Sequence, residues 1–213
     1  MNIKKIGHCC LIIKEKDVTI LTDPGMFTTG QNEVVGIDVV LITHEHADHL
    51  HIDSLKKVLQ NNPNAKVVTN TSVGKILEKE NILYSIVGDG QEIEIKDVVI
   101  VGKGTKHAVI YKEMGLVENT GYLINKKLFY PGDAFYNPQQ PVDILALPVA
   151  GPWVKIAEAI EYALALKPKH VFPVHDGVLN QFGVMGTKRW TEKVFTEAGI
   201  AFHALKESEE IEL

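Results

Sequence analysis

The chain has 213 residues, of which 45% are hydrophobic and 23% charged, and its formal net charge is −5. This composition is typical of an ordinary folded protein and disfavours a disordered or fibrous chain. We expect no nucleic-acid partner, because phosphate binding needs clustered Lys and Arg. We expect no membrane partner either, because no apolar run reaches the length of a membrane span.

In chain order, the first half alternates short β-rich runs with two amphipathic segments. It predicts two strands within 10–23, a strand over 38–43, a helix over 51–60, a strand over 66–70 and a helix over 72–80. The run at 38–43 is continuously apolar between polar residues, which is typical of a strand buried on both faces. Ser72 is the expected N-cap of the second helix.

The second half begins with strands and returns to an alternating order. Strands are predicted over 83–87, 92–95, 98–102, 119–124, 127–132, 143–151 and 170–174, helices over 154–168 and 187–199, and one or two edge strands in the last residues. Pro168 and Gly199 would end the two helices. This order predicts two β-sheets packed face to face with helices outside. We expect residues 1–213 to form a single domain.

The two cysteines of the chain, Cys9 and Cys10, are adjacent. A disulfide between neighbours is strained, so reduced thiols and a cytoplasmic location are expected. The N-terminal segment also lacks the apolar stretch of a signal peptide. We interpret one cysteine as facing the core and the other as lying at a sheet edge, because nothing nearby has the spacing of a cysteine metal site.

A short loop directly after the strand at 38–43 concentrates metal-ligand side chains. It reads HEHADHLH and supplies His44, His46, Asp48 and His49. The His-x-His step places two imidazoles on one side of an extended segment. Imidazole and carboxylate together suit Zn²⁺, Mn²⁺ or Fe²⁺. Because this loop cannot complete two ligand shells of about four ligands each, the remaining ligands should lie at other strand ends.

Suitable residues follow four other apolar β runs. They are Asp23, His107, Asp133 and His175. Each comes just past its run, so each could project from the same edge of the core. The sequence therefore predicts one metal-binding region assembled from five segments.

This ordered set resembles the metallo-β-lactamase superfamily, whose signature is His-x-His-x-Asp-His. The phrases "IGHCCLII", "ENTGYLINKKLFYPGDAFY" and "DILALPVAGPWV" look closest to the small metal-dependent hydrolases related to ascorbate-6-phosphate lactonase. The resemblance implies an α/β (α+β) fold. Its form would be a four-layer αββα sandwich of two mixed β-sheets with helices outside.

The resemblance also implies a role for each matched residue. His44, His46 and His107 would hold one divalent ion, Asp48, His49 and His175 a second, and Asp133 would bridge the two, while Asp23 would orient a ligand histidine by a hydrogen bond. Zinc is the expected metal, with manganese and iron as alternatives. Asp48 and Asp133 are the catalytic candidates, and His8, Lys106 and Trp153 are candidates for contact with a small-molecule substrate. Whether copies of the chain form a homo-oligomer is left open.

The implied activity is that of a dinuclear hydrolase. A hydroxide bridging the two metals would cleave a small-molecule ester, lactone or phosphate ester. The alternative is a mononuclear iron dioxygenase that acts on a thiol or persulfide. A nuclease is disfavoured by the acidic balance, and a non-catalytic binding protein by the intact ligand set. Two departures concern substrate identity: Lys106 stands where many relatives have Trp or an apolar residue, and Ala134 where Thr or Ser is common.

Overall fold

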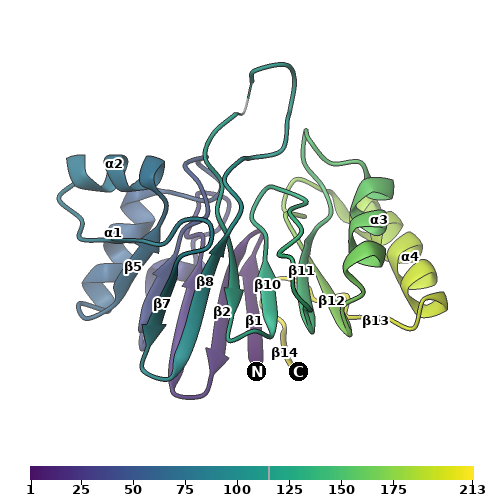
Figure 1. Ribbon diagram of the computed structural model, residues 1–213, viewed down its shortest axis with the longest axis horizontal. Helices are drawn as coiled ribbons and strands as arrows, with labels where there is room; N and C mark the ends of the chain where they lie inside the picture. The colour runs from purple at the N-terminus through teal and green to yellow at the C-terminus, as the bar shows by residue number, and fades with distance from the viewer. Residues whose placement is uncertain (115) are drawn as a thin grey trace.

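A computed structural model describes residues 1–114 and 116–213. Its strands form two seven-stranded sheets, ordered β14-β1-β2-β3-β4-β5-β6 and β13-β12-β11-β10-β9-β8-β7. The helices lie on the two outer flanks, α1 and α2 on one side and α3 and α4 on the other (Figure 1). The predicted fold class, two mixed sheets face to face with helices outside, is confirmed.

The elements have the following bounds. The strands are β1 (Asn2–Gly7), β2 (Cys10–Glu15), β3 (Val18–Thr22), β4 (Val39–Leu41), β5 (Lys66–Thr69), β6 (Ser85–Ile86), β7 (Glu92–Ile95), β8 (Val98–Lys103), β9 (Gly121–Ile124), β10 (Leu128–Tyr130), β11 (Ile144–Pro148), β12 (His170–Val174), β13 (Ala201–Phe202) and β14 (Glu210–Glu212). The helices are α1 (Ile52–Asn61), α2 (Thr71–Lys79), α3 (Ile156–Leu166), α4 (Gln181–Glu197) and the short 3₁₀ helix η1 (Gly30–Glu33).

Each sheet joins an antiparallel part to a parallel part. In the first sheet, β14, β1, β2 and β3 pair antiparallel and β3 to β6 pair parallel. In the second, β7 to β10 pair antiparallel and β10 to β13 pair parallel. The carboxyl ends of parallel strands meet at one edge of their sheet, so loops that leave these ends lie close together.

Strand β4 shows how the sequence builds the layers. Side chains alternate across a strand, so Val39 and Leu41 enter the apolar core between the sheets. Val40 and Ile42 enter a second core beneath α1 and α2. A third core packs α3 and α4 on the other sheet, with Phe195 of α4 among its members. Three apolar cores thus separate four layers, and the continuous apolar run of β4 is explained by burial on both faces.

Strand β1 was not predicted, and Lys5 is the reason. Its side chain is buried, which breaks the apolar alternation that local pattern reading requires. The Lys5 ammonium donates to both carboxylate oxygens of Asp176 at 2.7 Å and to the carbonyl oxygen of Pro173 at 2.9 Å. A partner far along the chain therefore makes this buried charge tolerable.

Two helix starts differ from the predicted ones. Helix α4 begins at Gln181, six residues before the predicted 187, because the Asn180 side chain accepts a hydrogen bond from the Gly183 N–H at 3.0 Å. Helix α2 is capped by Asn70, whose side chain accepts from the Val73 N–H at 3.1 Å. The expected cap, Ser72, lies inside the helix.

Both cysteines are free and buried. Strand β2 lies between β1 and β3, so the expectation of a cysteine at a sheet edge is wrong. Cys9 faces the core between the sheets and Cys10 faces the core under α1 and α2. Among the described residues, no helix combines the length and apolar character that crossing a bilayer requires.

A pair of leucine substitutions tests the layered core. Leu41→Ala should lower the free energy of unfolding by about 2–5 kcal/mol, since it opens a cavity between the sheets. Leu83→Ala is the control, because Leu83 is 91% exposed and its loss should change stability by no more than about 0.5 kcal/mol. Urea unfolding of both variants measures the difference. Equal losses would contradict the assignment of β4 to the central core.

Candidate metal centre

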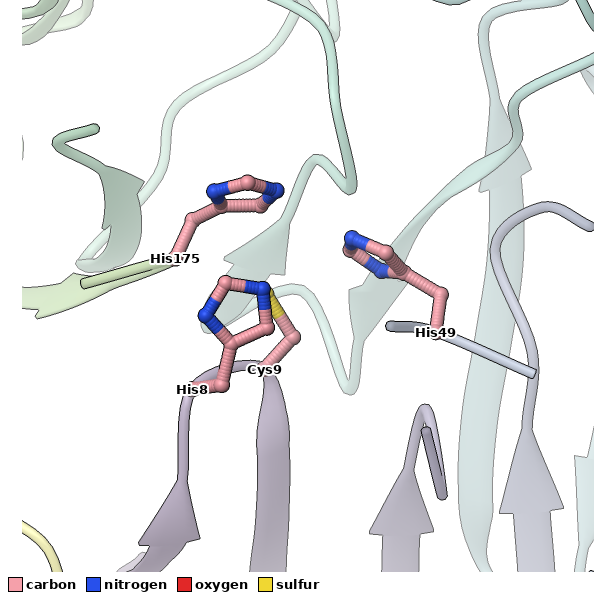
Figure 2. Close-up of side chains that lie close together, drawn as sticks. All are labelled: His8, Cys9, His49 and His175. Atoms are coloured by element: carbon pink, nitrogen blue, oxygen red, sulfur yellow. The ribbon is translucent and has the colours of Figure 1, made fainter. Parts of the chain in front are cut away.

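The predicted metal-ligand side chains lie together at one edge of the two sheets. Six of the seven predicted ligands fall in two clusters, and the second cluster also contains His8 and Cys9, which were not predicted as ligands. The first cluster is His44, His46, His107 and Asp133, the second is His8, Cys9, His49 and His175, and within each the donor atoms all lie within 4.8 Å of one another. Figure 2 shows the second cluster, in which the side chains of His8 and Cys9, from the turn between β1 and β2, lie near the rings of His49 and His175.

Asp133 belongs to the first cluster and also reaches the second. Its Oδ2 is 3.3 Å from His107 Nε2 in the first cluster and 2.9 Å from His175 Nε2 in the second. Its Oδ1 is 3.1 Å from His49 Nε2. A carboxylate with oxygens reaching donors of both clusters has the placement that a ligand shared by two ions needs.

Asp48 lies beside the second cluster. Its Oδ2 is 3.2 Å from His8 Nε2, 3.4 Å from His175 Nε2 and 3.8 Å from His49 Nε2. The Asp48 side chain is 20% exposed, whereas that of Asp133 is 4% exposed. Asp48 therefore lies nearer than Asp133 to the solvent from which a substrate arrives.

Several buried polar atoms point into the centre without hydrogen bonds. Among the described residues, no hydrogen-bond partner exists for His49 Nε2, His107 Nε2, Asp133 Oδ1 or either ring nitrogen of His175. The short contacts of Asp133 with these rings therefore lack hydrogen-bond geometry. Buried polar groups in folded proteins are normally paired, and imidazole with carboxylate suits Zn²⁺, Mn²⁺ or Fe²⁺. The residues present thus fit divalent metal ions.

Asp23, predicted to orient a ligand histidine, contacts His49 on the side away from the centre. Its Oδ2 accepts a hydrogen bond from His49 Nδ1 at 2.7 Å, which leaves Nε2 of that ring directed at the centre. The same carboxylate accepts from the Thr43 N–H at 2.8 Å and from the Tyr130 hydroxyl at 2.6 Å. A fully buried anion is held in place by these donors.

The ring of His8 has a fixed orientation. The Gly177 N–H donates to His8 Nδ1 at 3.1 Å, so this nitrogen is the acceptor and Nε2–H faces Asp48. The ring is also packed against Phe27, with 4.8 Å between ring centroids. His8 therefore orients Asp48, a role that the sequence did not assign when it marked His8 as a substrate candidate.

The two other substrate candidates lie in different places. The Trp153 Nε1–H donates to Asp133 Oδ2 at 2.9 Å, and the indole is buried. Lys106 is exposed, one residue before His107. Trp153 therefore holds a metal-ligand candidate, while a substrate role for Lys106 stays a prediction.

Three residues of the centre have left-handed backbone conformations. His8, Asp23 and His175 have φ values of 48°, 35° and 60°. Such residues cost about 1–3 kcal/mol each and cluster at functional sites. Each of the three residues directly follows a strand, so the backbone turns sharply there and the side chain points toward the centre.

Asp133 owes its position to two residues that the sequence did not single out. The Asn119 Oδ1 accepts from the Asp133 N–H at 3.0 Å, and its Nδ2 donates to the Pro131 carbonyl at 2.9 Å. Gly132 has a φ of +63°, and a Cβ there would lie 2.4 Å from Asn119 Oδ1. A glycine is therefore required for Asn119 to approach this turn.

Neighbouring charges set the electrostatics of the centre. Burial alone would raise the pKa of the Asp133 carboxyl, but the imidazoles led by His49 lower it well below its usual range. Burial likewise raises the pKa of the Cys9 thiol, whereas the charges of His8, His49 and His175 lower it to about 6. Neighbouring imidazoles thus favour the anionic forms of Asp133 and Cys9.

Comparisons with known proteins agree with this geometry. The β-lactamase superfamily domain matches residues 2–175. Protein Rv0786c of Mycobacterium tuberculosis is 33% identical over 184 residues, covering 84% of this chain and 85% of that protein. A UPF0173 protein of Pyrococcus abyssi is 30% identical over 198 residues, covering 89% and 90%. A UPF0173 metal-dependent hydrolase of Nanoarchaeum equitans is 28% identical over 229 residues, covering 100% of both chains.

Solved structures show the same fold. Igni18, a metallo hydrolase from Ignicoccus hospitalis, has a TM-score of 0.76 at 18% identity and covers 99% of this chain and 97% of its own. The metallo-β-lactamase fold protein YhfI from Bacillus subtilis has a TM-score of 0.75 at 16% identity and covers 99% and 98%.

The two tryptophans test whether Trp153 holds Asp133. Trp153→Phe keeps a buried aromatic ring but removes the N–H, so metal affinity should fall by roughly 10–100-fold. Trp190→Phe is the matched control, because Trp190 is 55% exposed. The zinc affinity of both variants is measured by titration against a chromophoric chelator. Unchanged affinity in Trp153→Phe would show that this hydrogen bond does not orient the carboxylate.

Proposed function

The chain belongs to the metallo-β-lactamase superfamily and its UPF0173 metal-dependent hydrolases, and we propose that it cleaves a small-molecule ester, lactone or phosphate ester. A dinuclear centre held by the predicted ligand residues carries the reaction. Asp48 and Asp133 are its central carboxylates.

One observation carries this proposal. Buried nitrogens of His49, His107 and His175 and an oxygen of Asp133 lack hydrogen-bond partners among the described residues. These atoms belong to two clusters, and Asp133 contacts both. Leaving such groups unpaired costs about 1–3 kcal/mol each, a cost that metal coordination removes. Two clusters sharing a carboxylate favour two ions over a single iron.

Different residues of the protein hold the metal-ligand side chains of this centre in position. When bound, the metal ions lower the pKa of a water molecule and polarise the bond to be cut. Asp133, fixed by Trp153 and Asn119, keeps the two clusters at a constant separation. Asp23 fixes the tautomer and direction of the His49 ring.

Asp48 is the residue best placed to act on the reacting water. His8 Nε2–H, 3.2 Å away, steadies its Oδ2, and its side chain is the more exposed of the two central carboxylates. From there Asp48 can accept a hydrogen bond from the attacking water and orient it toward the substrate. Holding a nucleophile in line is itself a large contribution to rate.

The predicted resemblance to the branch related to ascorbate-6-phosphate lactonase sets the order in which we propose to test substrates. A lactone that carries a phosphate group comes first, followed by simple lactones, carboxylic esters and phosphate esters. Lys106, exposed one residue before His107, is the candidate cation for a substrate phosphate. We propose this role from its position and charge alone.

Metal content is the first test. Protein purified without chelator or a nickel column should contain about two zinc or manganese ions per chain, measured by plasma mass spectrometry. Hydrolysis of a compound from the lactone and ester panel should then depend on those ions. About one iron per chain, with oxygen consumed on a thiol or persulfide, would overturn the hydrolase in favour of a dioxygenase.

Asp133→Ala tests the shared carboxylate. It should lower turnover by more than about 100-fold, the upper end of the cost of changing a mere supporting residue, and should lower the metal content as well. Asp97→Ala is the control, since the Asp97 side chain is 59% exposed and pairs with surface Lys16. Turnover in Asp133→Ala equal to that of the control would rule out the two-metal reaction.

A further inference from the structure

The adjacent cysteines lie in opposite environments. Side chains alternate across β2, so Cys10 packs beneath α1 and α2 with other apolar residues. Cys9 points the other way, into the edge of the central core where His8, His49 and His175 lie. Figure 2 shows the Cys9 sulfur beside the three imidazoles. Substitution of Cys10 can therefore serve as the control for substitution of Cys9, because the two thiols are adjacent in sequence but lie in different environments.

Two independent observations point to a ligand at this position. The Cys9 sulfur and one nitrogen from each of the three histidines all lie within 4.8 Å of one another. His49 Nε2 and both ring nitrogens of His175 are buried and have no hydrogen-bond partner among the described residues. Cys9 is itself buried, with 2% of its surface exposed, so its sulfur faces these buried nitrogens and not bulk solvent.

We propose that the Cys9 thiolate is a ligand of the second metal ion, together with His49 and His175. This inference rests on the proposed function, because it assigns a further donor to the same centre. The predicted second set did not contain Cys9. Asp48 Oδ2 lies 3.4 Å from His175 Nε2 and 3.8 Å from His49 Nε2, so Cys9 would add a donor to this set and would not replace Asp48. Asp48 accepts the hydrogen bond of His8 and faces the substrate side.

A thiolate changes the chemistry of this position. Sulfur is a soft donor that favours zinc and disfavours manganese, which prefers oxygen ligands. Zinc–sulfur bonds are about 2.3 Å long and zinc–nitrogen bonds about 2.0–2.1 Å, so small side-chain rotations bring the cluster onto one ion. Coordination forms the metal–sulfur bond and releases the thiol proton to water. The two metal positions would then differ in their preferred metal.

Cobalt substitution tests the proposal without an activity assay. Apoprotein is loaded with Co²⁺, the bound cobalt is counted, and the near-ultraviolet spectrum is recorded. A cysteine thiolate on Co²⁺ gives an intense charge-transfer band that imidazole and carboxylate do not give. The chain has only two cysteines, so Cys9→Ala and Cys10→Ala form a matched pair. We expect the band in the wild type and in Cys10→Ala, and its loss in Cys9→Ala with His-held cobalt still bound.

Each other outcome is decisive. About two cobalt ions per chain without the band in the wild type would overturn Cys9 ligation and leave the two-metal centre standing. A band that is lost in Cys10→Ala and kept in Cys9→Ala would also overturn it. A wild type that binds no cobalt would remove the proposed function together with this inference. Absence of the band in cobalt-loaded wild type is decisive without any variant, and a band in the wild type is assigned to Cys9 if a folded Cys10→Ala variant keeps it. Circular dichroism checks that each variant folds.

Discussion

The position of the Asp133 carboxylate is the constraint on which the rest of the structure depends. This group follows β10 in the second sheet, yet its oxygens lie within 3.3 Å of His49 from the first sheet and of His107 and His175 from the second. Such contacts exist only if the two sheets face each other with their ligand-bearing edges aligned. The central apolar core fixes that alignment, so packing far from the centre determines the geometry within it.

The centre lowers the stability of the polypeptide that carries it. Unpaired buried donors and acceptors cost about 1–3 kcal/mol each, and left-handed residues such as His175 add strain. Three apolar cores offset these costs. Metal binding would offset part of this cost to the extent that ions bind the folded chain more tightly than the unfolded one. The fold therefore positions the metal-ligand side chains before a metal ion binds.

Local pattern was sufficient for much of this architecture. The apolar run of β4 and the ligands placed at strand ends predicted the two sheets and the convergence of His44, Asp133 and His175. Local sequence pattern failed to predict the structure where contacts between residues far apart in the sequence determine it. Strand β1 was missed because Lys5 is buried by its pairing with Asp176, 171 residues away. The hydrogen bond from Trp153 to Asp133 and the clustering of Cys9 with histidines are likewise invisible to local periodicity.

The turn between β1 and β2 extends the centre beyond strand-end ligands. The carbonyl oxygen of His8 accepts a hydrogen bond from the His175 N–H at 3.2 Å, and Nδ1 of the His8 ring accepts one from the Gly177 N–H at 3.1 Å. The first hairpin therefore holds the loop that follows β12 near the other end of the chain. An ion at the second cluster would add side-chain bonds across the same junction. Occupancy of that cluster would then be coupled to the docking of the loop that follows β12, because each restricts the same pair of turns.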